Sequence, residues 1–107
     1  NLGWDLLRLK GLYPNVSHEV IARRMLDAPF PVIITVFDNG SLSWRKSNSP
    51  VVLPPLSEHE RTCWLAAYDS QQMTQYEDTV ESIACWPIHE EGWRREIMRT
   101  QTAWMEW

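Results

Sequence analysis

The longest uninterrupted apolar segment of the chain, PVIITVF from Pro31 to Phe37, has the length of a β-strand. The turn-forming residues Asp38-Asn39-Gly40 follow it, and polar and apolar residues then alternate from Ser41 to Arg45. Asn-Gly between two segments of this kind is a strong hairpin signal. The pattern therefore predicts an antiparallel β-hairpin from about residue 32 to residue 46.

The hairpin can form in two registers. A two-residue Asn39-Gly40 turn pairs Phe37 with Leu42, whereas a three-residue loop that begins at Asp38 pairs Val36 with Leu42. We prefer the second register, because a shift by one residue would move the buried side chains of a strand to its exposed face. In this register one face holds the apolar residues Val32, Ile34, Val36, Leu42 and Trp44.

Two helices are predicted before the hairpin, from apolar residues spaced three and four positions apart. The first covers Leu2 to Lys10 and ends at Gly11, since glycine adopts the left-handed conformation beyond a helix C-terminus at low cost. The second begins after Ser17, whose hydroxyl can accept a hydrogen bond from a backbone N–H of the first turn. Pro29 limits its C-terminal end.

Helices are also predicted after the hairpin. Ser57 and Glu60 match the capping-box pattern and indicate a helix from Glu58 to about Met73. A short helix is expected around residues 80–84, and the residues from His89 to about Trp107 are interpreted as a terminal helix. The sequence thus predicts a single α+β domain over residues 1–107, in which one antiparallel β-hairpin packs against three or four α-helices.

The predicted terminal helix suggests a contact with a partner. Trp93, Ile97, Thr100 and Trp104 would share one stripe, and this stripe is either core or interface. Tryptophan, methionine and arginine are enriched in protein interfaces. The residues of this segment with that character are Met98, Met105, Trp104, Trp107, Arg94 and Arg95. Because Met105 and Trp107 lie beyond the stripe, they are the first candidates for contacting another protein or a second copy of the chain.

The net charge of −4 is unevenly distributed along the 107 residues. Residues 1–54 carry a net charge of +2 and residues 55–107 a net charge of −6, with no lysine or arginine between Thr62 and Trp93. Glu77, Asp78 and Glu81 belong to this acidic region. Such a region repels nucleic acid and attracts a basic protein surface, or it only keeps the chain in solution.

A second interpretation is a zinc site. His59 and Cys63 are four residues apart, and Cys85 and His89 have the same spacing. Four ligands of these types satisfy tetrahedral zinc. Pro87 interrupts the second pair, however, and buried cysteine often acts as a small apolar residue. We therefore expect no metal and no cofactor.

A third interpretation is a winged-helix regulator, because two helices precede a hairpin and Arg23 and Arg24 lie on the second helix. The sequence pI of about 5.3 disfavours nucleic acid as a partner. The chain has no Gly-x-Ser-x-Gly, His-Glu-x-x-His or phosphate-binding glycine loop, so we expect no enzymatic activity. No segment reaches the ~18 apolar residues of a membrane-spanning helix. Two cysteines favour a cytoplasmic location.

These observations favour a small non-catalytic protein that binds and modulates another protein, such as an inhibitor, an immunity factor or an assembly accessory protein of a bacterium or a phage. The acidic region would attract a basic surface, and the aromatic terminal helix would supply affinity. The predicted contact residues are Glu77, Asp78, Glu81, Arg94, Arg95, Met98, Trp104, Met105 and Trp107.

Overall fold

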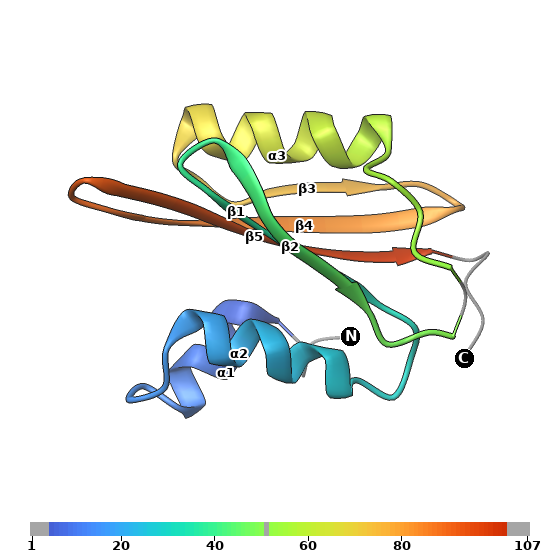
Figure 1. Cartoon of the computed structure of the whole chain (residues 1–107), viewed down its shortest axis with the longest axis horizontal. Helices are drawn as coiled ribbons and strands as arrows, with labels where there is room; N and C mark the ends of the chain where they lie inside the picture. Colours follow the sequence, from blue (N-terminus) through green and yellow to red (C-terminus); the bar gives the residue numbers. More distant parts are fainter. Residues whose placement is uncertain (1–4, 51, 103–107) are drawn as a thin grey trace.

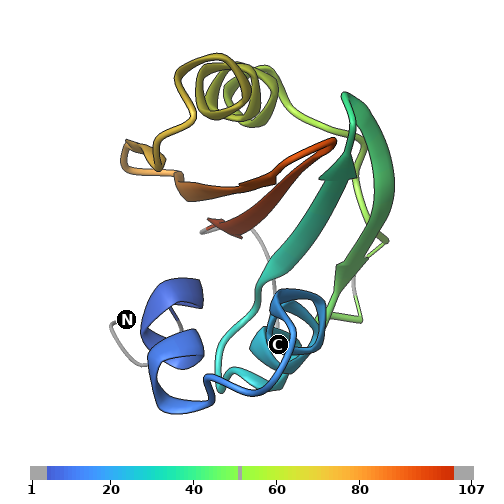
Figure 2. The ribbon, with the colours of Figure 1, turned by 90° about the vertical axis from the view of Figure 1, so that its left-hand side faces the viewer.

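A single antiparallel sheet of five strands organises the computed structural model, which describes residues 5–50 and 52–102. The spatial order of the strands is β2-β1-β5-β4-β3. Helices cover both faces of the sheet: α1 and α2 lie on one face and α3 lies on the other (Figures 1 and 2). The strands are β1 (Ile33–Asp38), β2 (Ser41–Ser47), β3 (Thr74–Glu77), β4 (Glu81–Glu90) and β5 (Trp93–Thr102). The helices are α1 (Leu6–Leu12), α2 (His18–Arg24), the short 3-10 helix η2 (Met25–Asp27) and α3 (Glu58–Ser70).

The predicted fold, one hairpin packed against three or four helices, is wrong because the second half of the chain is mostly strand. The segment expected to form a short helix around residues 80–84 belongs to β4. The predicted terminal helix is β5 as far as Thr102, and the rest of that prediction lies outside the described residues. β5 occupies the centre of the sheet, where it pairs with both β1 and β4.

The error has a physical cause in the two-sided burial of the central strands. In β5, Ile97 packs in the core between the sheet and α1/α2, while the next residue, Met98, packs in the core under α3. Cys85 and Trp86 of β4 divide between the two cores in the same way. A strand buried on both faces carries consecutive apolar residues, so the alternation that distinguishes a strand from a helix disappears.

The hairpin itself is present as β1 and β2, but the preferred register is wrong. Asn39 and Gly40 form a two-residue turn that pairs Phe37 with Leu42, and both turn residues have positive φ, 50° and 84°. A register shift beyond this pair then places Val36 opposite Trp44. The bulge therefore brings Trp44 against the core while Leu42 remains 50% exposed.

The helix caps are closer to prediction than the helix lengths. The Ser17 hydroxyl accepts from the N–H of Val20 at the start of α2, and the capping box of Ser57 and Glu60 is formed at the start of α3. Gly11 lies within α1, which ends at Leu12, so Gly11 does not end that helix as predicted. Among the described residues, no helix has the length and hydropathy needed to cross a membrane.

Candidate functional site

The four candidate zinc ligands do not come together. Cys63 and Cys85 are free thiols buried in the core under α3. Burial raises the pKa of both thiols, which disfavours the thiolate form that binds metal. His59 and His89 pair with different carboxylates, Glu81 and Glu96. The alternative interpretation as one Cys₂His₂ centre therefore finds no geometric support.

His59 instead contacts Glu81, a member of the predicted acidic region, and the neighbouring Tyr76. Its Nδ1 lies 2.7 Å from Oε2 of Glu81, and its ring stacks on Tyr76 with a centroid distance of 4.1 Å. The Tyr76 hydroxyl donates to Oδ2 of Asp78 at 2.7 Å. We call these four residues, His59, Tyr76, Asp78 and Glu81, the His59 cluster. The cluster joins the first turn of α3 to β3 and to the turn between β3 and β4.

Asp78 holds the turn between β3 and β4 in place. Its Oδ1 accepts from the backbone N–H groups of Val80 and Glu81, at 2.7 and 2.8 Å. Hydrogen bonds from the Glu81 N–H and the Tyr76 hydroxyl lower the pKa of Asp78, and the bond to Asp78 raises the pKa of the Tyr76 phenol. The carboxylate is therefore ionised at neutral pH and remains on the surface as a negative charge.

Three residues of the His59 cluster, one histidine and two acids, are close enough together to be considered as ligands of one metal ion. One ligand atom each from His59, Asp78 and Glu81 lies within 4.8 Å of the other two. An imidazole and two carboxylates are donors that a divalent cation accepts. His59 and Asp78 are exposed, and the Asp78 oxygens already serve the turn, so these residues by themselves do not define a metal centre.

A groove of about 340 Å³ runs beside the His59 cluster, between α3 and β3. We call it the α3–β3 groove. Among the described residues, β3 is an outer strand of the sheet and pairs only with β4. Thr74 and Tyr76 pair with Cys85 and Ile83, both of the core under α3, and therefore face the same side of the sheet as α3. The groove is lined from α3 by His59, Thr62, Cys63 and Ala66 and from β3 by Thr74, Gln75 and Tyr76.

The acidic residues near this groove are not neutralised by the arginines of the same half of the chain. In the described part of the chain, no ion pair joins Glu58, Glu77 or Asp78 to an arginine or a lysine. We call Glu58, Glu77, Asp78 and Glu81, which lie at one end of the sheet, the acidic face, although Glu77 is on the side of the sheet away from α3. The first turn of α3 and the β3–β4 turn, which carry these residues, lie at the same end of the molecule (Figure 1).

The arginines of β5 interact within the fold instead. Arg94 donates to the carbonyl oxygen of Tyr68 and lies over the Tyr68 ring. Arg95 pairs with Asp38 at 2.6 Å and with Glu19 at 2.9 Å, which joins β5 to β1 and α2. Arg94 and Arg95 of β5 thus contact α3, β1 and α2 within the fold, whereas the acidic residues around β3 lie at the surface.

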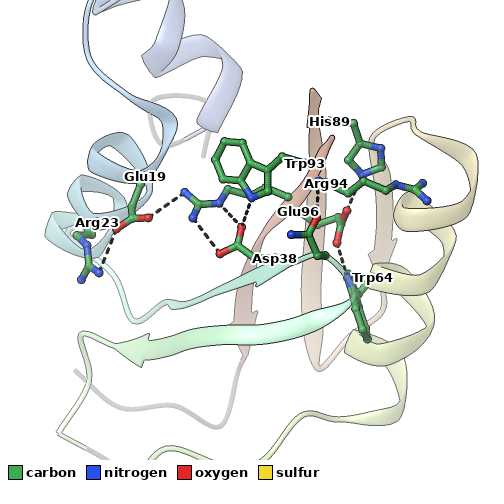
Figure 3. A network of polar contacts seen from close by, with 10 residues as sticks. Glu19, Arg23, Asp38, Trp64, His89, Trp93, Arg94 and Glu96 are labelled. Atoms are coloured by element: carbon green, nitrogen blue, oxygen red, sulfur yellow. Dashed lines mark hydrogen bonds and ion pairs between the residues drawn. The ribbon is translucent and has the colours of Figure 1, made fainter. Parts of the chain in front are cut away.

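A buried polar pair lies at the other end of the sheet. The Glu96 carboxylate is 0% exposed and accepts from the Trp64 indole N–H at 2.8 Å, and its second oxygen lies 2.5 Å from Nε2 of His89 (Figure 3). A cavity of about 470 Å³ adjoins His89 and is also lined by Asn39, Gln71, Glu90, Gly92, Trp93 and Arg94.

The His89–Glu96 pair has the two groups of a general base and its orienting carboxylate. The structure shows no hydroxyl or thiol hydrogen-bonded to either group within residues 5–50 and 52–102, so a nucleophile is missing. Nδ1 of His89 is buried without a hydrogen-bond partner in the same part of the chain. The His89 ring and the Trp64 N–H are therefore the polar partners of a buried carboxylate between β4, β5 and α3.

The predicted contact residues lie in different environments in the structure. Glu77, Asp78 and Glu81 lie together on the acidic face. Met98 belongs to a central strand and not to a helix, and it is 0% exposed, so it does not lie at the surface. Arg94 and Arg95 bind other parts of this chain. Trp104, Met105 and Trp107 lie outside the described residues.

The winged-helix interpretation finds little geometric support. Arg23 lies over the Trp44 ring at 4.4 Å and pairs with Glu19, while Arg24 pairs with Asp27. The hairpin is part of a five-stranded sheet and does not project as a separate wing. We therefore do not propose nucleic-acid binding.

The α3–β3 groove was missed at the level of sequence. The segment TQYE of β3 is only four residues long, and its partner strand includes residues 80–84, for which the sequence pattern predicts a helix. Alternation of Thr74 and Tyr76 with Gln75 and Glu77 was the available signal. Comparison of the chain with protein-family models, curated proteins and solved structures finds no match.

Proposed function

We propose that this chain acts by binding another protein through its acidic face. The observation that carries the proposal is the separation of charge within the second half of the chain: the arginines of β5 contact other parts of the fold, while Glu58, Glu77 and Asp78 have no arginine or lysine partner among the described residues. A cluster of unneutralised acids favours a partner with a basic surface.

The proposed role is non-catalytic, as for an inhibitor, an immunity factor or an assembly accessory protein of bacterial or phage origin. The acidic face would accelerate encounter with the basic surface, because electrostatic steering raises association rates. Apolar and aromatic contacts would then slow dissociation. We place this activity in the cytoplasm, where the two unbridged thiols of Cys63 and Cys85 would persist.

Capture of partners from an extract of the source organism tests the proposal. The full chain is compared with the charge-neutralised variant Glu58→Gln/Glu77→Gln, and bound proteins are identified by mass spectrometry. The matched control is Glu90→Gln/Glu91→Gln, which removes the same charge at the opposite end of the sheet, at the last residue of β4 and in the β4–β5 turn. Circular dichroism establishes that all three chains are folded.

We expect one specific partner to be lost from the Glu58/Glu77 variant and retained by the Glu90/Glu91 control. The association rate of that partner with the wild-type chain should fall as salt concentration rises, because the steering charges are screened. A partner that binds all three chains equally and without salt dependence would overturn the proposal.

A further inference from the structure

We infer that the partner binds as an extended segment, which pairs with the open edge of β3 and inserts an apolar side chain into the α3–β3 groove. The inference rests on the proposed function, because it specifies the form and chemistry of the partner at the same acidic face. The bound segment would alternate apolar and basic residues. Addition of a strand to a sheet edge, with alternate side chains entering pockets, is an established mode of peptide recognition.

The two outer strands of the sheet are not equally open. The chain that follows β2 returns alongside it (Figure 2), and Arg45 of β2 donates to the carbonyl oxygens of Pro54 and Pro55 at 3.2 and 3.5 Å. β3 pairs with β4 along one edge, and no strand of the described chain lies along its other edge. β3 also contains no proline or lysine, the residues that commonly protect an edge strand from pairing.

The groove gives the second element of recognition. A strand added to β3 would place every second side chain on the α3 side of the sheet, in line with Thr74 and Tyr76. On that side the groove of about 340 Å³ offers Cys63 and Ala66 of α3 as apolar contacts. This volume is at the lower end of the ~300–1,000 Å³ of small ligand sites, so it accommodates side chains but not a folded element.

Charge specifies the remaining positions of the partner segment. Gln75 and Glu77 alternate with Thr74 and Tyr76 and therefore face the other side of the sheet. A basic residue opposite Glu77 would form a cross-strand pair of opposite charges, which stabilises a sheet. Asp78 and Glu81 extend the negative charge beyond the end of β3. An acidic segment would be repelled at each of these positions.

The experiment uses a displayed library of random ten-residue segments, selected on the full-length chain. Ala66→Trp fills the groove from an exposed position of α3. The control is Leu65→Trp at the preceding position, which is 43% exposed and does not line the groove. We expect enrichment of segments that alternate apolar and basic residues. Their affinity should fall about tenfold or more in Ala66→Trp and stay unchanged in Leu65→Trp.

Amide hydrogen exchange distinguishes strand addition from side-chain binding alone. The selected peptide should slow exchange at the outward-facing amides of residues 74–77, and leave exchange in β2 unchanged. The inference would be overturned if no alternating segment is enriched, if both tryptophan variants bind alike, or if β3 gains no protection.

The partner captured through the acidic face provides the link to the proposed function. If that partner depends on Glu58 and Glu77 but binds Ala66→Trp as tightly as Leu65→Trp, strand addition fails and the proposed function survives. If no captured partner depends on the acidic face, the proposed function itself fails.

Discussion

Arg45 of β2 and Glu60 of α3 form a buried ion pair in which two guanidinium nitrogens donate to the two carboxylate oxygens, each at 2.9 Å. The same carboxylate accepts from the Ser57 N–H at 2.9 Å and from the Thr100 hydroxyl at 2.6 Å. Glu60 therefore closes the capping box of α3 and also attaches α3 to the sheet. A residue that the sequence identifies as a helix cap is a main polar contact between two layers of the fold.

Substitution of Glu60 by glutamine should strongly destabilise the protein. The Arg45 side chain is only 7% exposed, so the variant leaves its charge buried without a counter-ion, at a cost of roughly 3–5 kcal/mol. The free energy of unfolding in urea measures the loss. Glu58→Gln, in the same helical turn but exposed, should change it by less than about 0.5 kcal/mol. Equal effects of the two substitutions would contradict the role assigned to Glu60.

A double substitution separates charge burial from packing. Arg45→Met/Glu60→Leu removes both charges and should recover most of the stability that Glu60→Gln loses, because apolar pairs commonly replace buried ion pairs without cost. If the double variant is less stable than Glu60→Gln, the cost arises from packing and the electrostatic explanation fails.

Acid should reduce stability through Asp38. The hydrogen bonds from Arg95 hold the pKa of Asp38 below its ordinary value of 3.8, and burial opposes them only in part. A carboxyl group with a lowered folded-state pKa stabilises the fold fully above its unfolded pKa, and that contribution is lost as pH falls toward the folded value. Asp38→Asn should therefore be less stable than wild type above about pH 5, and the difference should shrink below about pH 4.

Urea unfolding of both chains between about pH 2.5 and pH 6 measures this difference. Glu60 contributes acid sensitivity of the same sign to both chains: burial raises its pKa, but the hydrogen bonds from Arg45, Thr100 and Ser57 outweigh burial and lower it overall. Its contribution cancels in the difference between the two chains. A difference that stays constant with pH would show that Asp38 acts through neutral hydrogen bonds only.

Helix caps and the position of the hairpin can be predicted from the sequence, but the five-stranded sheet cannot. Ser17 and the capping box of Ser57 and Glu60 act through neighbouring residues, so their patterns survive in the structure. Asn39-Gly40 marks the position of the hairpin, but the preferred register is wrong because it depends on a bulge farther along the strands. β4 and β5 depend on pairing partners and on two covering helix layers. Their consecutive buried residues remove the alternation that would have identified them as strands.

The candidate site also has one part that the sequence indicates and one part that only the structure shows. The acidic residues Glu77, Asp78 and Glu81 are visible in composition, and their neighbourhood follows from one short turn. His59 reaches Glu81 across 22 positions of sequence, and the α3–β3 groove exists only because β3 pairs with β4 under α3. Contacts of this range depend on tertiary packing, which residue spacing alone does not encode.

Trp64 should stabilise the protein through its indole N–H. Trp64→Phe retains an aromatic ring against Phe37, where the two rings now stack with centroids 4.1 Å apart, but removes one of the donors to the buried Glu96 carboxylate. The expected loss is about 1–3 kcal/mol, the usual cost of leaving a buried polar group unpaired. Denaturant unfolding followed by circular dichroism gives the value.

Trp93→Phe is the matched control for this prediction. The Trp93 indole donates at 3.2 Å to Asp38, which is partly exposed and keeps both hydrogen bonds from Arg95, so the loss should be below about 1 kcal/mol. Adding Glu96→Gln to Trp64→Phe should reduce the loss in the free energy of unfolding, since it removes the carboxyl group that the indole N–H contacts. A larger effect of Trp93→Phe than of Trp64→Phe would contradict the assignment.

Two glycines should respond in opposite directions to alanine. Gly40 has a φ of +84° in the hairpin turn, so Gly40→Ala forces a side chain into the left-handed region and should cost about 1–2 kcal/mol. The added Cβ would meet Oη of Tyr68 only at 3.7 Å, an ordinary contact, so the cost is one of backbone conformation. Gly11 lies inside α1, where an added Cβ would meet no neighbouring element of the described chain within 4 Å, so Gly11→Ala should gain about 0.5–1 kcal/mol by restricting the unfolded chain. Thermal unfolding of the two variants beside wild type measures both effects, and a loss in Gly11→Ala would show that α1 does not extend through this position.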